Sequence, residues 1–537
     1  MLTEKQIESL IDSLTLDEMI GQMLCYNVVL SGDDLSRTEE FLSKTHAGSL
    51  FVDGEAKANR IDDLMAMFKK YNKIPGMIAA DIENGPGSLW SDEVKLPHPM
   101  AWGACGDADL IRRAHEAIAI RCRQKGVHWS FSPLVDINFN CDNPLVNIRG
   151  ISDRAELVAK IGRAAVQGFE AGGRMMSCAK HFPGDGVDDR NQHFCTTVNS
   201  LSKEEWMNTF GAVYKEMFKA GVASVMVAHI SLPAYDEKIN EWLGYPPASL
   251  SYNLQTKLLK EELGYTGCVI SDAMSMVGAC ACVPADRLAI EFFKAGGDLM
   301  IFPVLEDFDR IKGAVLSGEI PMERVRDAVR RVIRLKDKAR LFEDQDEVLK
   351  GIDFNANVEE LKNLATEIAE KSLCLVRNYG KEVPLSLKPG DKIFIANIKN
   401  IEGGGLPAGS LDFVEEELRN RGFNVVSRDN PHRGDMEEMA DAAVVLVNCK
   451  ISSQDYNGGS LRIGWPQIAP FWRGEVLKHP HVIFTSFGDP YKLHDFPFLK
   501  TYINTFSFSE YTQKAFVKAL LGEIPFQGKS PVTLKDE

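Results

Sequence analysis

One polar stretch of the chain is rich in groups that can move protons or bind hydroxyls. Residues 180–193 read KHFPGDGVDDRNQH, with two glycines, a proline, three aspartates and almost no apolar side chain. Such a stretch cannot fill a hydrophobic core, which indicates a loop with a chemical role. His193 at its end is a candidate proton donor, because an unperturbed imidazole titrates close to neutral pH.

Short apolar runs rich in β-branched residues precede polar residues at regular intervals. They span 47–54, 76–85, 127–138, 175–184, 223–233, 267–275 and 297–303, with 23–29 as a further run, and amphipathic helical stretches separate them. This alternation predicts a parallel sheet covered by helices, and the number of units favours a (β/α)8 barrel over an open doubly wound sheet. In a barrel the polar residues at the run ends would share one mouth: Asp53, Asp81, Asp136, Lys180, His181, His229 and Asp272.

The chain is too long for a single hydrophobic core, and the pattern of runs predicts two domains. We expect a TIM-like barrel over 1–342, a polar linker over 343–360, and a smaller α/β sandwich or doubly wound domain over 361–537. Strands of the second domain are predicted within 372–378, 392–398, 423–429, 442–448, 481–488 and 501–507. The sequence IEGGGLPAG at 401–409 matches neither common phosphate-loop pattern and is interpreted as a turn or lid-like loop.

The composition argues against several classes of partner. Lysine and arginine total 61 against 76 aspartates and glutamates, a formal net charge of −15, and no basic run stands out, which disfavours nucleic-acid binding. The N-terminal residues lack the pattern of a signal peptide and no uncharged run is long enough for a membrane span, so we expect no membrane association. The 11 cysteines are scattered without a CxxC pair, which predicts reduced thiols in a cytoplasmic protein.

Three kinds of site fit the residues at the run ends. Metal-assisted hydrolysis is disfavoured, because His181 and His193 are twelve residues apart and neither belongs to a close histidine pair. Glycoside hydrolysis requires a nucleophilic carboxylate and a separate proton donor, roles that suit Asp272 and His193. The third alternative is a carbohydrate-binding barrel without catalysis.

The motifs KHFPGDG (180–186), with a later histidine at 193, and ISDAMSM (270–276) resemble the signature segments of glycoside hydrolase family 3. The likeness is to its β-N-acetylhexosaminidase branch, in which an Asp-x-His dyad follows the lysine-histidine motif. It extends over nearly the whole chain. Segments such as LTLDEMIGQML (14–24), FSPLVDINFNCDNPLVNIRG (131–150) and FGDPYKL (487–493) fall in the family's order.

The resemblance implies a role for each matching residue. Asp272 would be the nucleophile that forms a covalent glycosyl intermediate, and His193 the acid/base, with Asn191 where the family has the dyad aspartate. The implied sugar contacts are Asp81, Arg149, Lys180 and His181. We also expect His229, at the end of its run, and Met274, beside Asp272, to line the substrate site. No metal or organic cofactor is implied, and the partner would be a small-molecule or oligosaccharide substrate.

Three positions depart from the family pattern: Asn191, Asp185 in place of a histidine, and Pro86 in place of an arginine. Asn191 can accept a hydrogen bond from His193 but supplies no charge. Three explanations of this asparagine stay open. The residue is natural and Asp188 or Asp189 supplies the charge, it is an engineered substitution, or the protein is weakly active or inactive. We therefore expect a retaining hydrolase that removes terminal β-linked N-acetylglucosamine. A β-glucosidase, a β-glycoside phosphorylase and a sugar-binding pseudoenzyme are the alternatives, and the oligomeric state is open, with a homodimer as one alternative.

Overall fold

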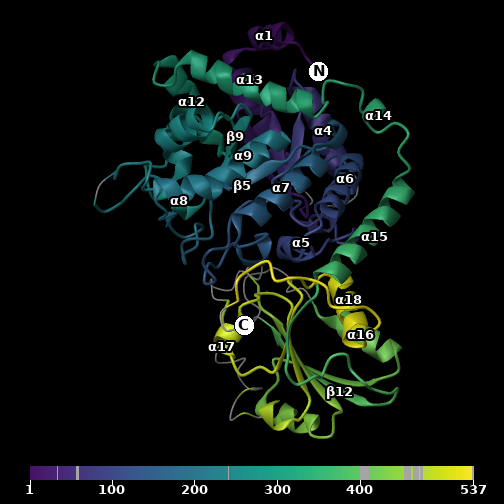
Figure 1. Ribbon diagram of the computed structural model, residues 1–537. Helices are drawn as coiled ribbons and strands as arrows, with labels where there is room; N and C mark the ends of the chain where they lie inside the picture. The colour runs from purple at the N-terminus through teal and green to yellow at the C-terminus, as the bar shows by residue number, and fades with distance from the viewer. Residues whose placement is uncertain are drawn as a thin grey trace. The chain divides into compact units, whose positions relative to one another are not determined.

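The computed structural model describes the chain except for residues 33, 56–59, 240, 400–409, 453–460, 464–470, 472–473, 475 and 535–537. Contacts divide it into two units (Figure 1). The first comprises 1–94, 111–136 and 162–361, and the second comprises 95–110, 137–161 and 362–537. The second unit therefore includes two segments from within the range predicted for the barrel. The predicted linker contains α14 (Gln345–Val348) and the start of α15 (Phe354–Ser372), and the predicted loop at 401–409 lies outside the described residues.

Parallel strands that follow chain order form the centre of the first unit. They are β1 (Leu24–Val29), β2 (Ser49–Asp53), β3 (Met77–Ala80), β4 (Trp129–Ser130), β5 (Cys178–Phe182), β7 (Ser224–Val227), β9 (Cys268–Ser271) and β10 (Met300–Ile301). Pairing runs from β10 through β1, β2 and β3 to β4, and separately from β5 through β7 to β9. Parallel bridges join Trp129 to Met176, and Ile270 to Leu299. The parallel sheet is therefore curled, and each strand lies within a run predicted as a strand.

Helices lie between successive strands of this sheet (Figure 1). They include α3 (Ser36–Thr45), α4 (Arg60–Tyr71), α6 (Ala108–Gln124), α7 (Ala155–Phe169), α8 (Lys203–Asn208), α9 (Phe210–Ala220), a helix at Asn253–Glu262, α10 (Val277–Cys280) and α11 (Leu288–Ala295). Before the first strand come α1 (Glu4–Asp12) and α2 (Leu16–Gln22), and after the last come α12 (Leu305–Leu316) and α13 (Met322–Lys338). The local sequence determines where some of these helices begin. Thr15 and Glu18 form a reciprocal capping box at the start of α2, as Ser202 and Glu205 do at the start of α8. None of the helices in the described ranges is long and apolar enough to cross a membrane.

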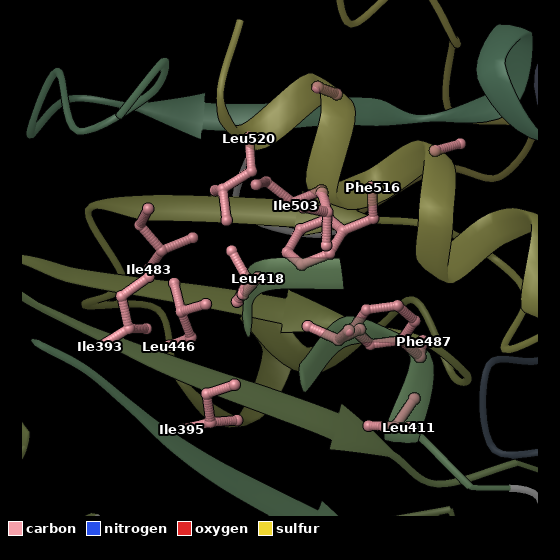
Figure 2. Close-up of a cluster of buried hydrophobic side chains, with 14 of the residues drawn as sticks. Ile393, Ile395, Leu411, Leu418, Leu446, Ile483, Phe487, Ile503, Phe516 and Leu520 are labelled. Carbon is pink, nitrogen blue, oxygen red and sulfur yellow. The ribbon is translucent and has the colours of Figure 1, made fainter. Parts of the chain in front are cut away.

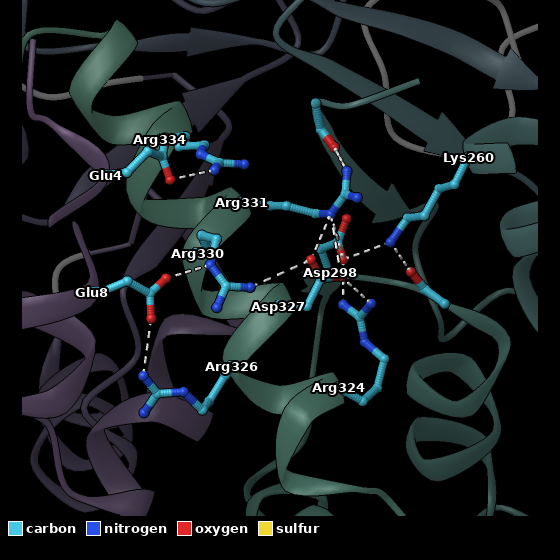
Figure 3. Close-up of polar contacts among 12 residues, drawn as sticks. Glu4, Glu8, Lys260, Asp298, Arg324, Arg326, Asp327, Arg330, Arg331 and Arg334 are labelled. Carbon is cyan, nitrogen blue, oxygen red and sulfur yellow. Dashed lines mark hydrogen bonds and ion pairs between the residues drawn. The ribbon is translucent and has the colours of Figure 1, made fainter. Parts of the chain in front are cut away.

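A buried carboxylate fixes α13 to the amino-terminal end of β10 (Figure 3). Asp298, which precedes β10, accepts from the backbone N–H of Val269 at 2.8 Å and pairs with Lys260 at 2.9 Å. Arg324 on α13 also pairs with it. Because a buried ion pair that loses one partner leaves an uncompensated charge, this cluster holds its members in one arrangement. Asp298 is therefore a structural acceptor.

Lys336 on α13 is a buried lysine. In the described part of the chain, its side chain donates a hydrogen bond to the neutral side chain of Gln22. Its side chain is inaccessible to solvent, and Nζ donates to Oε1 of Gln22 at 2.6 Å. Burial lowers the pKa of Lys336 to about 7. In the unfolded chain a lysine has a pKa of about 10.4. Between these values the unfolded state binds more protons, so Lys336 makes the free energy of unfolding rise with pH in this window.

We expect Lys336→Met to stabilise the protein by about 2 kcal/mol at pH 6, after allowance for the lost hydrogen bond to Gln22. The gain should shrink as pH rises from 7 to 10, because the native lysine is then neutral in the folded state. Thermal unfolding of both proteins at pH 6 and pH 9 tests this. Lys350→Met, at an exposed lysine, is the control and should change little at either pH. An equal gain at both values would contradict the expectation.

A second parallel sheet lies at the centre of the other unit. Its strands are β11 (Cys374–Asn378), β12 (Lys392–Lys399), β13 (Asn424–Asp429), β14 (Val444–Lys450), β15 (Val482–Ser486) and β16 (Thr501–Asn504), in the order β11-β16-β15-β14-β12-β13. All neighbours are parallel except β11 and β16. The strand positions match the six predicted runs.

Apolar side chains cover both faces of this second sheet. On one face, α16 (Asp412–Asn420) and α18 (Glu510–Leu520) pack over Ile393, Leu446 and Ile503 (Figure 2). On the other, Phe394, Val447, Phe484 and Tyr502 pack with residues that include Leu493 of α17 (Lys492–Asp495). A sheet buried on both faces needs strands that are almost continuously apolar, which is why these runs were recognisable from sequence.

Candidate active site

The carboxyl ends of β3 and β5 are linked through Lys180. This buried lysine, on β5, lies 2.8 Å from Oδ1 of Asp81 and 2.9 Å from Oε1 of Glu83, both of which follow β3. Asp81 is exposed, whereas Glu83 is buried. Lysine only donates and carboxylates only accept, so the trio presents both kinds of partner to hydroxyl groups. The structure thus brings together two residues predicted for this site and adds Glu83, which the sequence analysis did not single out.

His181 is held by the carboxylate of Asp136, in the segment that follows the strand β4. Oδ2 of Asp136 lies 2.7 Å from Nδ1 of His181, and Oδ1 accepts from the backbone N–H groups of His181 at 3.0 Å and Asp185 at 2.7 Å. Because Nδ1 faces a carboxylate, it carries the proton. Asp136 therefore orients the ring and fixes the start of the following loop, which is a structural role.

The loop after β5 places His193 against Asn191. Oδ1 of Asn191 lies 2.6 Å from Nδ1 of His193 and accepts from its backbone N–H at 2.9 Å. The amide oxygen thus lies where the family resemblance implies the dyad carboxylate. Asp188 is held by Arg190 at 2.6 Å and by the N–H of Val198 at 2.8 Å. The neutral amide of Asn191 therefore fills the position beside Nδ1 of His193, while the charge of Asp188 is paired with Arg190.

The loop that carries His193 is bound to the segment that follows β9. The backbone N–H of Val277 donates to the carbonyl of His193 at 3.2 Å, and the hydroxyl of Thr196 donates to the carbonyl of Gly278 at 2.8 Å. A Cβ on Gly278 would lie 2.6 Å from the carbonyl oxygen of Gln192, so a larger residue would push the two segments apart. The loop then ends in β6 (Thr197–Val198), which pairs with β8 (Ile230–Ser231).

His229, after β7, connects both of these segments. Its backbone N–H donates to Oε1 of Gln192 at 3.1 Å, and its Nε2 lies 3.0 Å from the carbonyl oxygen of Ala273. Its Nδ1 lies 2.9 Å from the hydroxyl of Ser249. Because a carbonyl only accepts, Nε2 carries the proton and Nδ1 accepts from the serine. Burial lowers the pKa of His229, in keeping with a neutral ring, and direct contact of this ring with a sugar stays a prediction.

Asp272 directly follows β9 and is partly exposed. Its backbone N–H donates to the carbonyl of Val227 at 2.9 Å, which places it at the end of the neighbouring β7. Burial on its own would raise the pKa of Asp272, but the nearby His181, the N–H of Ala273 and the charge of Lys180 outweigh it and lower the pKa. The carboxylate is therefore ionised at neutral pH, as a nucleophile requires.

The two remaining predicted contacts, Met274 and Arg149, belong to different units. Met274 is buried, and its backbone N–H donates to the carbonyl of Ile301 at 3.4 Å. Arg149 belongs to the second unit, where Nη1 donates to the carbonyl of Leu145 at 3.2 Å. Their roles in binding sugar stay predictions. Within the described ranges, no three His, Cys, Asp or Glu side chains are grouped so that they could hold a metal ion.

Comparison with known proteins identifies the class of protein to which this site belongs. The model of the glycosyl hydrolase family 3 N-terminal domain matches residues 15–335. The beta-N-acetylglucosaminidase/beta-glucosidase of Cellulomonas fimi is 30% identical over 533 residues, covering 96% of this chain and 93% of that protein. The chain therefore belongs to glycosyl hydrolase family 3, which supports a glycosidase, and the predicted family is confirmed.

Two solved structures share the fold. Beta-glucoside phosphorylase BglX bound to 2FGlc has a TM-score of 0.88 and 28% identity, covering 100% of this chain and 98% of that one. A family 3 beta-N-acetylglucosaminidase from Paenibacillus sp. str. FPU-7 has a TM-score of 0.83 and 24% identity, with 97% and 99% covered. The two-unit α/β architecture is thus common to proteins whose names give different reactions.

Proposed function

We propose that the protein is a retaining β-glycosidase that removes terminal β-linked N-acetylglucosamine, with Asp272 as nucleophile and His193 as acid/base. The observation that carries the proposal is the hydrogen bond from Val277 N–H to the His193 carbonyl, which joins the segment after Asp272 to the loop that delivers the histidine. The name of the Cellulomonas fimi relative supports this substrate class. We also propose that the curled sheet is a (β/α)8 barrel, closed by the bridges at Trp129 and Ile270.

The chemistry would take two steps. Asp272 would attack the anomeric carbon while His193, through Nε2, protonates the departing glycosidic oxygen. His193 would then take a proton from water as the water oxygen attacks the same carbon and releases Asp272. Asp81, Glu83 and Lys180 would accept from and donate to the sugar hydroxyls.

Phosphorolysis is the second candidate, and two observations favour it. BglX, a beta-glucoside phosphorylase by name, aligns over the full chain. In addition, the partner of His193 is the uncharged amide of Asn191, so the dyad adds no negative charge where a phosphate would attack the glycosyl intermediate. In that case phosphate would release a sugar 1-phosphate in place of the free sugar.

The first test is turnover of p-nitrophenyl β-N-acetylglucosaminide and β-glucoside, each with and without inorganic phosphate. We expect the N-acetyl substrate to react faster and free sugar to be the main product. Faster release with phosphate, together with a sugar 1-phosphate, would favour the phosphorylase. No turnover of either substrate under both conditions would contradict both candidates and favour a sugar-binding protein.

A further inference from the structure

A cavity of about 360 Å³ lies in the first unit, at the amino-terminal ends of β7 and β9. Its lining consists of residues 221–223 before β7, residues 264–268 at the start of β9, Phe218 of α9 and part of α13. Asp272 follows the carboxyl end of β9, so the cavity and the proposed nucleophile lie at opposite ends of this strand. A cavity of this volume is large enough for a small organic molecule.

The part of the lining that α13 supplies carries three cations. Arg334 and Lys338 follow Arg331 by three and seven residues, a spacing that places all three on one face of the helix. No aspartate or glutamate is among the described residues that line the cavity. In a chain with a formal net charge of −15, three cations without a lining carboxylate favour a negatively charged ligand.

The charged ends of two of these side chains border the cavity. Nη1 of Arg331 donates to the carbonyl of Gly267 at 2.9 Å, and Nζ of Lys338 donates to the carbonyl of Gly221. Both glycines belong to the lining. Thr266, an exposed residue between them in space, adds a hydroxyl that can donate to the same anion. The cavity therefore offers charged and neutral donors together.

The carboxylates that pair with these cations lie outside the lining. The pairs are Arg331 with Asp327 at 3.3 Å, Arg334 with Glu4 at 2.6 Å (Figure 3), and Lys338 with Glu170 at 2.9 Å. Both members of the pair between Arg334 and Glu4 are exposed, and such a pair contributes little free energy. In the described part of the chain the contacts of Arg331 use Nε and Nη1, so its Nη2 is a donor for a ligand.

Much of the remaining lining is apolar. Phe218 is half-buried, and its ring centroid lies 4.6 Å from that of the buried Tyr265. Val222 and Leu335 are also buried and extend this surface. A phosphate ion alone has no apolar part to pack here, whereas the organic part of a phosphate monoester does. The ester also carries close to two negative charges at neutral pH, which suits three cations better than a single carboxylate does.

We propose that this cavity binds a phosphate monoester. Arg331 and Lys338 donate to the phosphate oxygens, Arg334 adds positive charge, and the organic part packs on Phe218. The proposal concerns binding alone, so it is independent of the reaction that takes place at the carboxyl ends of the strands.

The experiment is a calorimetric titration of the full chain with phenyl phosphate, inorganic phosphate and phenol. We expect phenyl phosphate to bind at least about tenfold more tightly than either of the other two. Thr266→Glu places a carboxylate at an exposed position of the lining and should weaken binding of phenyl phosphate at least about tenfold. Arg334→Gln should weaken it about fivefold, because it removes one of the three cations.

Two further variants separate the parts of the site. Arg326→Gln removes a cation that also lies on α13 and pairs with α1 but does not line the cavity, and it should leave the affinity unchanged. Phe218→Ala should weaken binding of phenyl phosphate and leave that of inorganic phosphate unchanged, because only the ester packs on the ring. Thermal unfolding of each variant shows whether it is folded, without reference to any catalytic activity.

The pattern across the variants decides the outcome. Binding of phenyl phosphate that neither Thr266→Glu nor Arg334→Gln weakens would place the ligand elsewhere in the protein and overturn the proposal. Equal affinities for phenyl phosphate and inorganic phosphate, or no binding of either, would also overturn it. Binding with the expected pattern in a protein that turns over no glycoside would support the cavity site and contradict the proposed function.

Discussion

Replacing Asp272 with alanine is expected to lower turnover of a β-glycoside at least about ten-thousand-fold, because the change removes the atom that attacks the anomeric carbon. The lowered pKa of Asp272 means that the carboxylate is ionised at neutral pH, and no other group needs to deprotonate it first. The loss should therefore be similar across the neutral pH range. Steady-state rates with the p-nitrophenyl substrates measure it.

The matched control is Asp189→Ala, which removes an exposed carboxylate from the loop that carries His193. Its turnover should stay within a few-fold of the wild type. A 2-deoxy-2-fluoro glucoside bearing a good leaving group should also label Asp272. The fluorine slows both formation and breakdown of the glycosyl intermediate, whereas the good leaving group speeds its formation alone, so the intermediate accumulates. Label on another residue, or more than a hundredth of the activity in Asp272→Ala, would contradict the assignment of the nucleophile.

The strands were predictable because both sheets are buried on two faces. A strand such as β14 or β9 must then be apolar at consecutive positions, and such runs stand out in the sequence. The division of the chain into two units was harder to predict from the sequence. Segments 95–110 and 137–161 interrupt the first unit in sequence, and their membership of the second depends on long-range contacts that no local pattern reports.

The candidate site was partly predictable for a related reason. Lys180 and His181 lie near the carboxyl end of β5, while His229 follows β7 and Asp272 follows β9. The carboxyl ends of parallel strands meet at one edge. Gln192 was missed although it is almost fully buried and bonds to the backbone of His229. A glutamine in a polar loop has no local signal for burial, because its partner comes from another strand.

The sequence analysis did not single out Glu83, because Asp81 already supplied the polar residue expected at the end of β3. Its partner is again distant in sequence, since Lys180 lies on β5. Ser249 is a third case, with its hydroxyl beside Nδ1 of His229. In each instance the residue supports a predicted one, and only the folded chain shows which polar side chains do so.

Asn191→Asp is expected to raise hydrolysis about a hundredfold. The wild-type amide orients His193 through its 2.6 Å contact with Nδ1 but leaves the imidazolium formed during turnover without a compensating charge. Aspartate has nearly the same shape and adds that charge. In the serine-protease triad the reverse change costs about ten-thousand-fold, and a smaller effect is expected here because the amide oxygen already fixes the tautomer.

Two comparisons separate this effect from a general change of charge or folding. Asn208→Asp adds the same charge at an exposed helix position and should leave the rate unchanged. With His193→Ala in the background, Asn191→Asp should give no gain, because the carboxylate acts through the imidazole. Added phosphate should also accelerate Asn191→Asp less than the wild type, since a second anion near the intermediate repels the first. An unchanged rate in Asn191→Asp would mean that proton transfer by His193 does not limit turnover.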